Sequence, residues 1–212
     1  EQNMKTLTRA GSLAAFAAVA VASLANLSSY GGYVTVNSSE AVGGGLGPGY
    51  FTYNAGNASL NNWTVGGTSI DVVTLPPGVY PIYAGNASLD LLGTPGPGSI
   101  SQAITTVVGQ SYDLSFWAQA NVAGINQTVN LDVIGAATQS TSFTVAVGTW
   151  TQYTWSFMAD STSTTIRFAS DPLNAGNGNT FMDNVEVVPE PLTISVLGLG
   201  LAAIARRRNR KA

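Results

Sequence analysis

Residues 111–118 read Ser-Tyr-Asp-Leu-Ser-Phe-Trp-Ala, a stretch in which apolar and polar side chains alternate. Tyr112, Leu114, Phe116 and Ala118 share one parity, and successive side chains of a strand point to opposite faces of a sheet. This period of two predicts a strand with one buried face. Further runs alternate in the same way: Val129, Leu131 and Val133; Phe143, Val145 and Val147; Tyr153, Trp155 and Phe157; Ile166 and Phe168; Val185 and Val187.

Turn-forming residues separate these runs. Residues 93–98 read Gly-Thr-Pro-Gly-Pro-Gly, and residues 174–179 read Asn-Ala-Gly-Asn-Gly-Asn. Gly, Pro and Asn favour turns because each suits backbone conformations that a strand does not use. Many short strands without helical periodicity predict an all-β fold, an antiparallel β-sandwich of the jelly-roll kind.

Residues 189–212 differ in composition from the rest of the chain. Pro189-Glu190-Pro191 precedes an apolar stretch of 14 residues, 192–205. As a helix this stretch would extend roughly 21 Å, which is short of the roughly 30 Å hydrocarbon core of a bilayer. We expect a short C-terminal transmembrane helix with its basic end in the cytoplasm, and an ordinary tail anchor is the alternative. Five of the next seven residues are Arg or Lys, among them Arg206, Arg207 and Arg208.

Residues 4–25 are expected to form the helix of a secretory signal peptide. Met4 is followed by Lys5 and Arg9, and the apolar run 13–24 leads to small residues that suit cleavage after Ala22 or Ala25. A buried core helix is the alternative interpretation. The chain is therefore predicted to comprise a signal peptide (4–25), a β-sandwich domain (26–188) and an anchor segment (189–212).

The predicted domain is strongly acidic. Residues 26–188 contain nine Asp and Glu residues and a single cation, Arg167, so their net charge is near −8, whereas the whole chain carries −3. A domain with one cation cannot neutralise phosphates, which excludes nucleic acid as a partner. Hard cations with oxygen ligands are the natural counter-charge.

The chain contains no Cys and no His. This composition excludes disulfides, thiol catalysis, the Ser-His-Asp arrangement, and the usual zinc and haem sites. Catalysis by paired carboxylates stays open, but no spacing selects such a pair. We therefore predict that the protein is not an enzyme.

The tail resembles a known sorting signal. Residues 188–212 combine Pro-Glu-Pro, a short apolar segment and an Arg-rich end, as in the PEP-CTERM signal of Gram-negative bacteria. The resemblance implies that an exosortase recognises Pro189, Glu190 and Pro191 and removes the tail. It also implies an intermediate in the inner membrane, followed by release to, or attachment at, the cell surface or extracellular matrix.

Several segments of the domain follow the order of one family. They are 36–40 (Val-Asn-Ser-Ser-Glu), 63–67 (Trp-Thr-Val-Gly-Gly), 69–73 (Ser-Ile-Asp-Val-Val), 85–91 (Gly-Asn-Ala-Ser-Leu-Asp-Leu), 96–102 (Gly-Pro-Gly-Ser-Ile-Ser-Gln) and 182–185 (Met-Asp-Asn-Val). Through them the domain resembles the DUF642 or choice-of-anchor C family, and 96–102 is the most specific match. Residues 37–40 depart from the family's opening motif because they lack its Gly and aromatic residue. The resemblance implies a galactose-binding-like jelly roll, similar to carbohydrate-binding modules.

Asp183 is a candidate metal ligand. It shares the parity of Val185 and Val187, so its carboxylate is expected on the core-facing side of the last strand. A buried carboxylate needs a partner, and calcium would supply one, with backbone carbonyls and Glu40 completing the oxygen shell. Related jelly rolls carry a structural calcium at this strand junction, and the resemblance extends that site to Glu40 and Asp183. Hydrogen bonds from backbone amides to Asp183 are the alternative.

Trp117 is the candidate sugar-binding residue. Its parity opposes the apolar row and places it with Asp113 and Ser115 on the outer face, where an aromatic ring beside polar groups suits a pyranose. Burial of this ring under a loop is the alternative. Trp63 and Trp155 are expected to lie in the core.

We therefore expect an exported β-sandwich that engages polysaccharide of the matrix or cell wall. One alternative is a passive structural component of the matrix without a discrete ligand. A glycan-active enzyme is a third possibility, for which the sequence nominates no pair of carboxylates.

Overall fold

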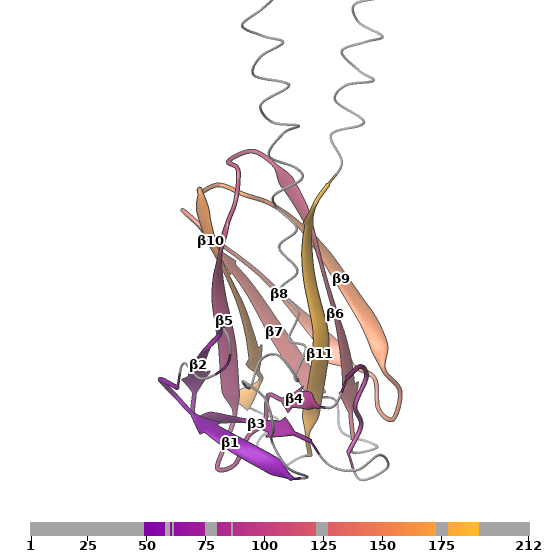
Figure 1. The fold of residues 1–212 in the computed structure, drawn as a ribbon. Helices are drawn as coiled ribbons and strands as arrows, with labels where there is room; N and C mark the ends of the chain where they lie inside the picture. The colour runs from indigo at the N-terminus through magenta and orange to yellow at the C-terminus, as the bar shows by residue number, and fades with distance from the viewer. Residues whose placement is uncertain are drawn as a thin grey trace, which may run out of the picture.

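A computed structural model describes residues 49–57, 60, 62–74, 80–85, 87–121, 127–172 and 178–190. These residues contain eleven strands (Figure 1). In chain order the strands are β1 (Tyr50–Asn54), β2 (Thr64–Gly67), β3 (Ser69–Val73), β4 (Ser88–Asp90), β5 (Gly98–Thr105), β6 (Ser111–Ala120), β7 (Gln127–Ile134), β8 (Thr138–Val145), β9 (Thr151–Met158), β10 (Ser163–Ser170) and β11 (Thr180–Pro189).

The strands form two antiparallel sheets that face each other (Figure 1). The six-stranded sheet has the order β1-β3-β4-β11-β6-β9, and the five-stranded sheet has the order β2-β5-β10-β7-β8. The predicted all-β antiparallel sandwich is confirmed. The predicted signal helix and C-terminal transmembrane helix lie outside the described residues. Within the described part of the chain, no helix has the length and apolar character needed to cross a membrane.

The alternating runs supply the core between the two sheets. Phe116 of β6 lies at its centre, 5.0 Å between ring centroids from Phe168 of β10 and 5.5 Å from Tyr153 of β9. Trp63 is 2% exposed and also packs against Phe168, as expected for a core residue. Trp155 is partly buried and packs against the core from β9, at the edge of its sheet. The fully buried large side chains of this core are Phe116, Phe168, Leu60, Ile70, Leu89, Leu91, Ile100, Leu114, Leu131, Ile166 and Met182, and Phe181 is buried on the outer side, against Tyr80.

One expectation about the core is wrong. Val147 was expected to share the buried face of Phe143 and Val145, but β8 ends at Val145 and Val147 is 39% exposed. The chain turns here, because the amide of Gly148 donates a hydrogen bond to the carbonyl of Ala120 on β6. The strand parity therefore does not continue past Val145.

The Gly-Pro-Gly segment at 96–98 lies close to β3. A Cβ atom added to Gly98 would overlap the carbonyl oxygen of Ser69, and one added to Gly93 would lie 2.6 Å from the Cα of Ile70. Ser69 donates a hydrogen bond from its hydroxyl to the carbonyl of Gly96. The motif therefore needs glycine because its backbone lies against the neighbouring strand, which has all five residues buried.

A β-bulge in β11 changes which side chains face the core. The register of β11 against β6 shifts between Asp183 and Glu186, and Asn184 has a φ of 50°. Met182 pairs with Ala118 and Val187 pairs with Leu114, so Met182 and Val187 face the core although their parity differs. The prediction that Asp183 faces the core with Val185 and Val187 is wrong, because the extra residue of a bulge reverses the alternation.

Candidate functional site

Three aromatic side chains gather on the outer face of the six-stranded sheet. Tyr83 comes from the segment 80–85, Trp117 from β6, and Trp150 from the connection between β8 and β9. The rings of Tyr83 and Trp117 stack with centroids 4.2 Å apart and an interplanar angle of 17°. The ring centroids of Tyr83 and Trp150 are 5.7 Å apart, and the two ring planes are inclined at 58°. We call these three residues the aromatic cluster.

Trp117 lies on the outer face, as its parity predicts, and is partly buried there. It pairs with Asp183 on one side and with the exposed Gln152 on the other. Because Tyr83 covers one side of its ring, Trp117 presents less free surface than the sequence suggests. Tyr83 is the more accessible ring, with 38% of its surface exposed. Tyr83 and Trp150 could not be predicted from alternation, because both lie in connecting segments without strand periodicity.

Asp113 lies on the same outer face but is not in the aromatic cluster. It is four residues from Trp117 along β6, which corresponds to roughly 13 Å at about 3.3 Å per residue. Its carboxylate accepts a hydrogen bond of 2.6 Å from the hydroxyl of Ser156 on β9. The structure therefore does not bring the two predicted ligand-binding residues into contact.

Asp183 lies on the outer face beside Trp117 and is only 1% exposed. Its Oδ2 accepts a hydrogen bond of 3.0 Å from the amide of Ala84, and its Oδ1 accepts one of 2.8 Å from its neighbour Asn184. Burial raises the pKa of Asp183 to about 6, although amide donors that include Tyr83 oppose the rise. Asp183 therefore caps the segment that carries Tyr83, which is the alternative that the sequence left open.

A second contact fixes the same segment. The hydroxyl of Ser88 on β4 donates a hydrogen bond of 2.8 Å to the carbonyl of Pro81. Tyr80 packs on Phe181 of β11, with ring centroids 5.6 Å apart. Segment 80–85 is therefore held across β4, β11 and β6, which sets the position of Tyr83.

The calcium site expected at Glu40 and Asp183 cannot be assembled from the described residues. Glu40 lies outside them, and both carboxylate oxygens of Asp183 accept hydrogen bonds from backbone amides. Within the described ranges, no group of three or more Asp or Glu side chains could hold a metal ion. Calcium binding therefore stays a prediction.

Asp71 and Asp90 form a buried carboxylate pair on β3 and β4. They are direct register partners, 5% and 1% exposed. Asp71 accepts hydrogen bonds from the hydroxyl of Thr52 and from the amide and hydroxyl of Thr94. Asp90 accepts them from the amides of Leu92 and Thr180 and from the side chain of Asn179. All four oxygens have donors, so this pair serves to connect strands and loops.

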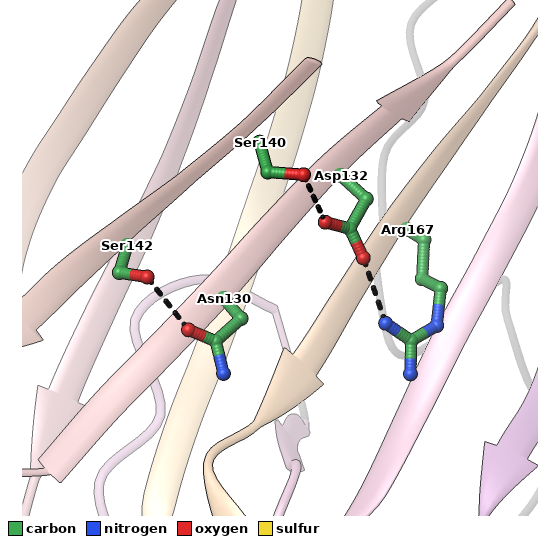
Figure 2. Close-up of polar contacts among 5 residues, drawn as sticks. All are labelled: Asn130, Asp132, Ser140, Ser142 and Arg167. Carbon is green, nitrogen blue, oxygen red and sulfur yellow. Dashed lines mark hydrogen bonds and ion pairs between the residues drawn. The ribbon is translucent and has the colours of Figure 1, made fainter. Parts of the chain in front are cut away.

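Arg167 lies on β10 of the five-stranded sheet, whereas Trp117 lies on β6 of the six-stranded sheet. Figure 2 shows the polar contacts around Arg167. Its guanidinium donates a hydrogen bond of 2.8 Å to Asp132, its partner across β10 and β7. The hydroxyl of Ser140 donates to the other oxygen of Asp132, and the hydroxyl of Ser142 donates to Asn130, the next pair on the same face. The one cation of residues 26–188 is therefore neutralised by Asp132, within a row of polar cross-strand pairs.

Pro189 and Glu190 are the two residues of the predicted sorting signal that the structure describes. Pro189 is the last residue of β11 and pairs with Tyr112 of β6. The amide of Glu190 donates a hydrogen bond of 2.9 Å to the carbonyl of Ser111. Pro191, Arg206, Arg207 and Arg208 lie outside the described residues.

Residues 48–186 match the family described as "Protein of unknown function (DUF642)". The chain belongs to the DUF642 family. The resemblance drawn from the sequence motifs is thereby confirmed. The part of the chain that matches DUF642 includes the aromatic cluster and Asp183, and it leaves Glu40 outside.

This DUF642 chain is also similar to a curated protein and to solved structures. Halomucin of Haloquadratum walsbyi is 27% identical over 147 residues, which span 66% of this chain but only 2% of halomucin. TmCBM61, solved in complex with β-1,4-galactotriose, is similar with a TM-score of 0.47 and 18% identity over 61% of this chain and 90% of its own. The CBM22-1 xylan-binding domain of Paenibacillus barcinonensis Xyn10C has a TM-score of 0.45 and 16% identity over 66% of this chain and 92% of its own.

Proposed function

We propose that this protein binds polysaccharide through the aromatic cluster on the six-stranded sheet. Aromatic faces stack on the apolar faces of sugar rings, and neighbouring polar groups fix the orientation of the ligand. Tyr83 supplies the exposed ring, and Trp117 and Trp150 support it. Gln119 and Gln152 flank Trp117 on the same face and carry amides that both donate to and accept from hydroxyl groups. The gathering of three rings at one place carries this proposal.

The charges around the cluster favour a neutral polysaccharide over an acidic one. Asp113 and Glu186 lie on the same outer face as Trp117. The one cation of residues 26–188, Arg167, lies on the other sheet and is paired with Asp132. Acidic sugars would therefore meet like charges at this face without a compensating cation.

A glycan array probed with the purified protein and with Tyr83→Ala and Trp150→Ala tests this function. We expect neutral glycans to be retained by the wild type and lost by both variants. Tyr50→Ala is the matched control, because Tyr50 is 57% exposed on β1, four strands from β6 in the same sheet. A folded wild-type protein that retains no glycan would favour the passive structural role.

Export and sorting form the second part of the proposal. The basic start and apolar run of residues 4–25 support secretion, and the three-part segment 188–212 supports recognition by an exosortase-type enzyme. On this basis the protein passes through the inner membrane and reaches the cell surface or extracellular matrix. A non-catalytic role agrees with the hydrogen-bonded burial of Asp71 and Asp90.

Calcium binding is a separate proposal that needs ligands in addition to Asp183, and Glu40 is the residue that the sequence nominates. An ion bound only to the native state stabilises it by about 2.7 kcal/mol at a hundred times its dissociation constant. Melting curves with calcium and with a chelator would differ accordingly. Identical curves would leave capping of segment 80–85 as the role of Asp183.

A further inference from the structure

One end of the sandwich exposes four apolar side chains. The turn between β5 and β6, the last residue of β9 and the last part of β11 lie together at this end (Figure 1). We call the four residues the apolar rim, and an exposed apolar group of this kind usually marks a contact surface. They are Val107 (49% exposed), Val108 (59%), Met158 (58%) and Val188 (39%).

The turn at the centre of the rim is fixed by hydrogen bonds. The amide of Val107 donates to the Tyr112 hydroxyl at 3.0 Å, and the amide of Gly109 donates to the carbonyl of Ala159 at 2.7 Å. The amide of Gln110 closes the turn on the carbonyl of Val107 at 3.0 Å. Turns normally present Gly, Asn, Asp or Ser to water. This turn instead holds Val107 and Val108 outward, where they remain in contact with solvent.

The chain leaves the sandwich at the same end and is fastened there. The amide of Glu190 donates to the carbonyl of Ser111 at 2.9 Å, and the side-chain amide of Gln110 donates to the carbonyl of Glu190 at 3.0 Å. Ser111 is also the strand partner of Met158. Only Pro191 separates Glu190 from the apolar stretch 192–205. One residue extends at most about 3.6 Å, so this connection leaves almost no free length.

We propose that the apolar rim rests on the lipid surface while the segment 192–205 is inserted in the membrane. This inference rests on the proposed sorting route, in which that segment holds the protein at the inner membrane. With a connection of one residue, insertion brings Val107, Val108, Met158 and Val188 to the membrane interface. Burial of their side chains there is favourable by the hydrophobic effect. The tail thus selects lipid, rather than a second copy of the chain, as the partner of this end.

The full chain in vesicles provides the test, because it contains no Cys and accepts a single label. Val108→Cys places an environment-sensitive fluorophore on the rim. Thr149→Cys is the matched control, because Thr149 is an exposed turn residue before β9. The eight residues of β9 separate the two ends by roughly 26 Å at about 3.3 Å per residue. Vesicles of zwitterionic lipid avoid repulsion between anionic lipid and the acidic domain.

We expect lipids that carry a quencher near the headgroup to reduce the emission of the Val108 probe and to leave the Thr149 probe unchanged. Chains that float with the vesicles while both probes respond equally would overturn the inference and leave membrane anchoring intact. Chains that do not float would overturn anchoring and the inference together. The emission of the Val108 probe could instead depend on the protein-to-lipid ratio and not on the quencher content. That result would overturn the inference, because it would mean that a second copy of the chain covers the rim.

Discussion

Asp183 and Trp117 are direct register partners on β11 and β6, and both side chains lie on the outer face of the six-stranded sheet. The carboxylate of Asp183 binds the amide of Ala84, next to the tyrosine that stacks on Trp117. A buried carboxylate therefore sets the geometry of the aromatic cluster from beneath it.

Replacement of Asp183 by Ala should destabilise the protein and loosen the cluster. The amides of Ala84 and Asn184 would lose their acceptor, and an unsatisfied buried donor costs about 1–3 kcal/mol. Denaturant unfolding measures the loss of stability, and near-ultraviolet circular dichroism reports the altered Tyr83 and Trp117 packing. Asp113→Ala is the control, because Asp113 is an exposed carboxylate on the same face. Equal effects of both variants would mean that Asp183 has no special role in the loop.

The stability of the protein should increase as the pH falls from about 7 to about 4.5. Burial raises the pKa of Asp90 to about 7 and that of Asp183 to about 6, whereas the ordinary value for both is 3.8. A raised pKa means that the folded state binds the proton more tightly than the unfolded state. This contribution is complete below pH 3.8 and is lost as the pH rises through 6 and 7.

Melting temperatures across this range check the pH prediction, and Asp90→Asn should flatten the profile. The side-chain oxygen of an Asn at this position still accepts the amides of Leu92 and Thr180. Its NH2 group replaces the oxygen that the side chain of Asn179 donates to, and a rotated Asn179 amide could accept a hydrogen bond from that NH2 group. Amide hydrogen bonds from Ala137 and Ala136 lower the pKa of Asp160, so its stabilising effect is lost only below its ordinary value of 3.8. A wild-type profile that falls toward pH 4.5 would contradict the prediction.

Trp117→Ala should cost less stability than Trp63→Ala. Trp63 is 2% exposed in the core, and truncation of a buried Trp costs about 3–5 kcal/mol. Trp117 lies outside the core, where its loss removes mainly the stack with Tyr83, and an aromatic pair contributes about 0.5–1.5 kcal/mol beyond its area burial. Urea unfolding of the two variants provides the comparison. Equal losses would show that Trp117 has a core role and would weaken its assignment to a binding surface.

Gly98→Ala should destabilise the sandwich more than Gly96→Ala. The added methyl group at Gly98 would overlap the carbonyl of Ser69 and force β5 away from β3, and overpacking of this kind costs about 1–3 kcal/mol. At Gly96 the nearest atom to the new methyl group is the Thr68 hydroxyl at 3.5 Å, an ordinary contact. Thermal unfolding of both variants measures the difference. If the Gly98→Ala variant unfolds at the same temperature as the wild type, β5 and β3 can move apart without a loss of stability, and the prediction is wrong.

The protein extracted from the cell surface should lack the residues that follow Pro191. An apolar segment too short for a stable span and an Arg-rich end suit removal of the tail after export. Intact-mass analysis measures the C-terminus directly, and replacement of Arg206, Arg207 and Arg208 by Ala should let unprocessed chain leave the membrane. A mature mass that still includes residues 206–210 would contradict the sorting proposal.

The sequence predicted the fold wherever a strand has one face in the core and one in water. The alternation in β6 and β7 is of this kind, and it identified their buried rows, including Phe116 and Leu131. It did not separate a core face from a water face in β3, because Ser69 and Asp71, which alternate with Ile70 and Val72, are buried under the loop around Thr94 and Gly96. Parity also gave a wrong result in β11, because the extra residue of the bulge at Asn184 changes which side chains face the core on its two sides.

The candidate site was predictable only in part for a related reason. Trp117 lies on a regular strand, so its face follows from counting residues. Tyr83 and Trp150 reach it from connecting segments, and their positions depend on long-range contacts such as the bond between Asp183 and Ala84. No local pattern encodes contacts between residues 99 positions apart in the chain.

The position of β11 inside its sheet affects when the protein can fold. β11 lies between β4 and β6, although it is the last strand of the described sandwich to be synthesised. A growing chain that has released only the first ten strands leaves β6 and β9 without their link to β1, β3 and β4. The six-stranded sheet closes only when residues 180–189 arrive, so a chain that stops before them cannot complete the sandwich, however well its first ten strands are formed.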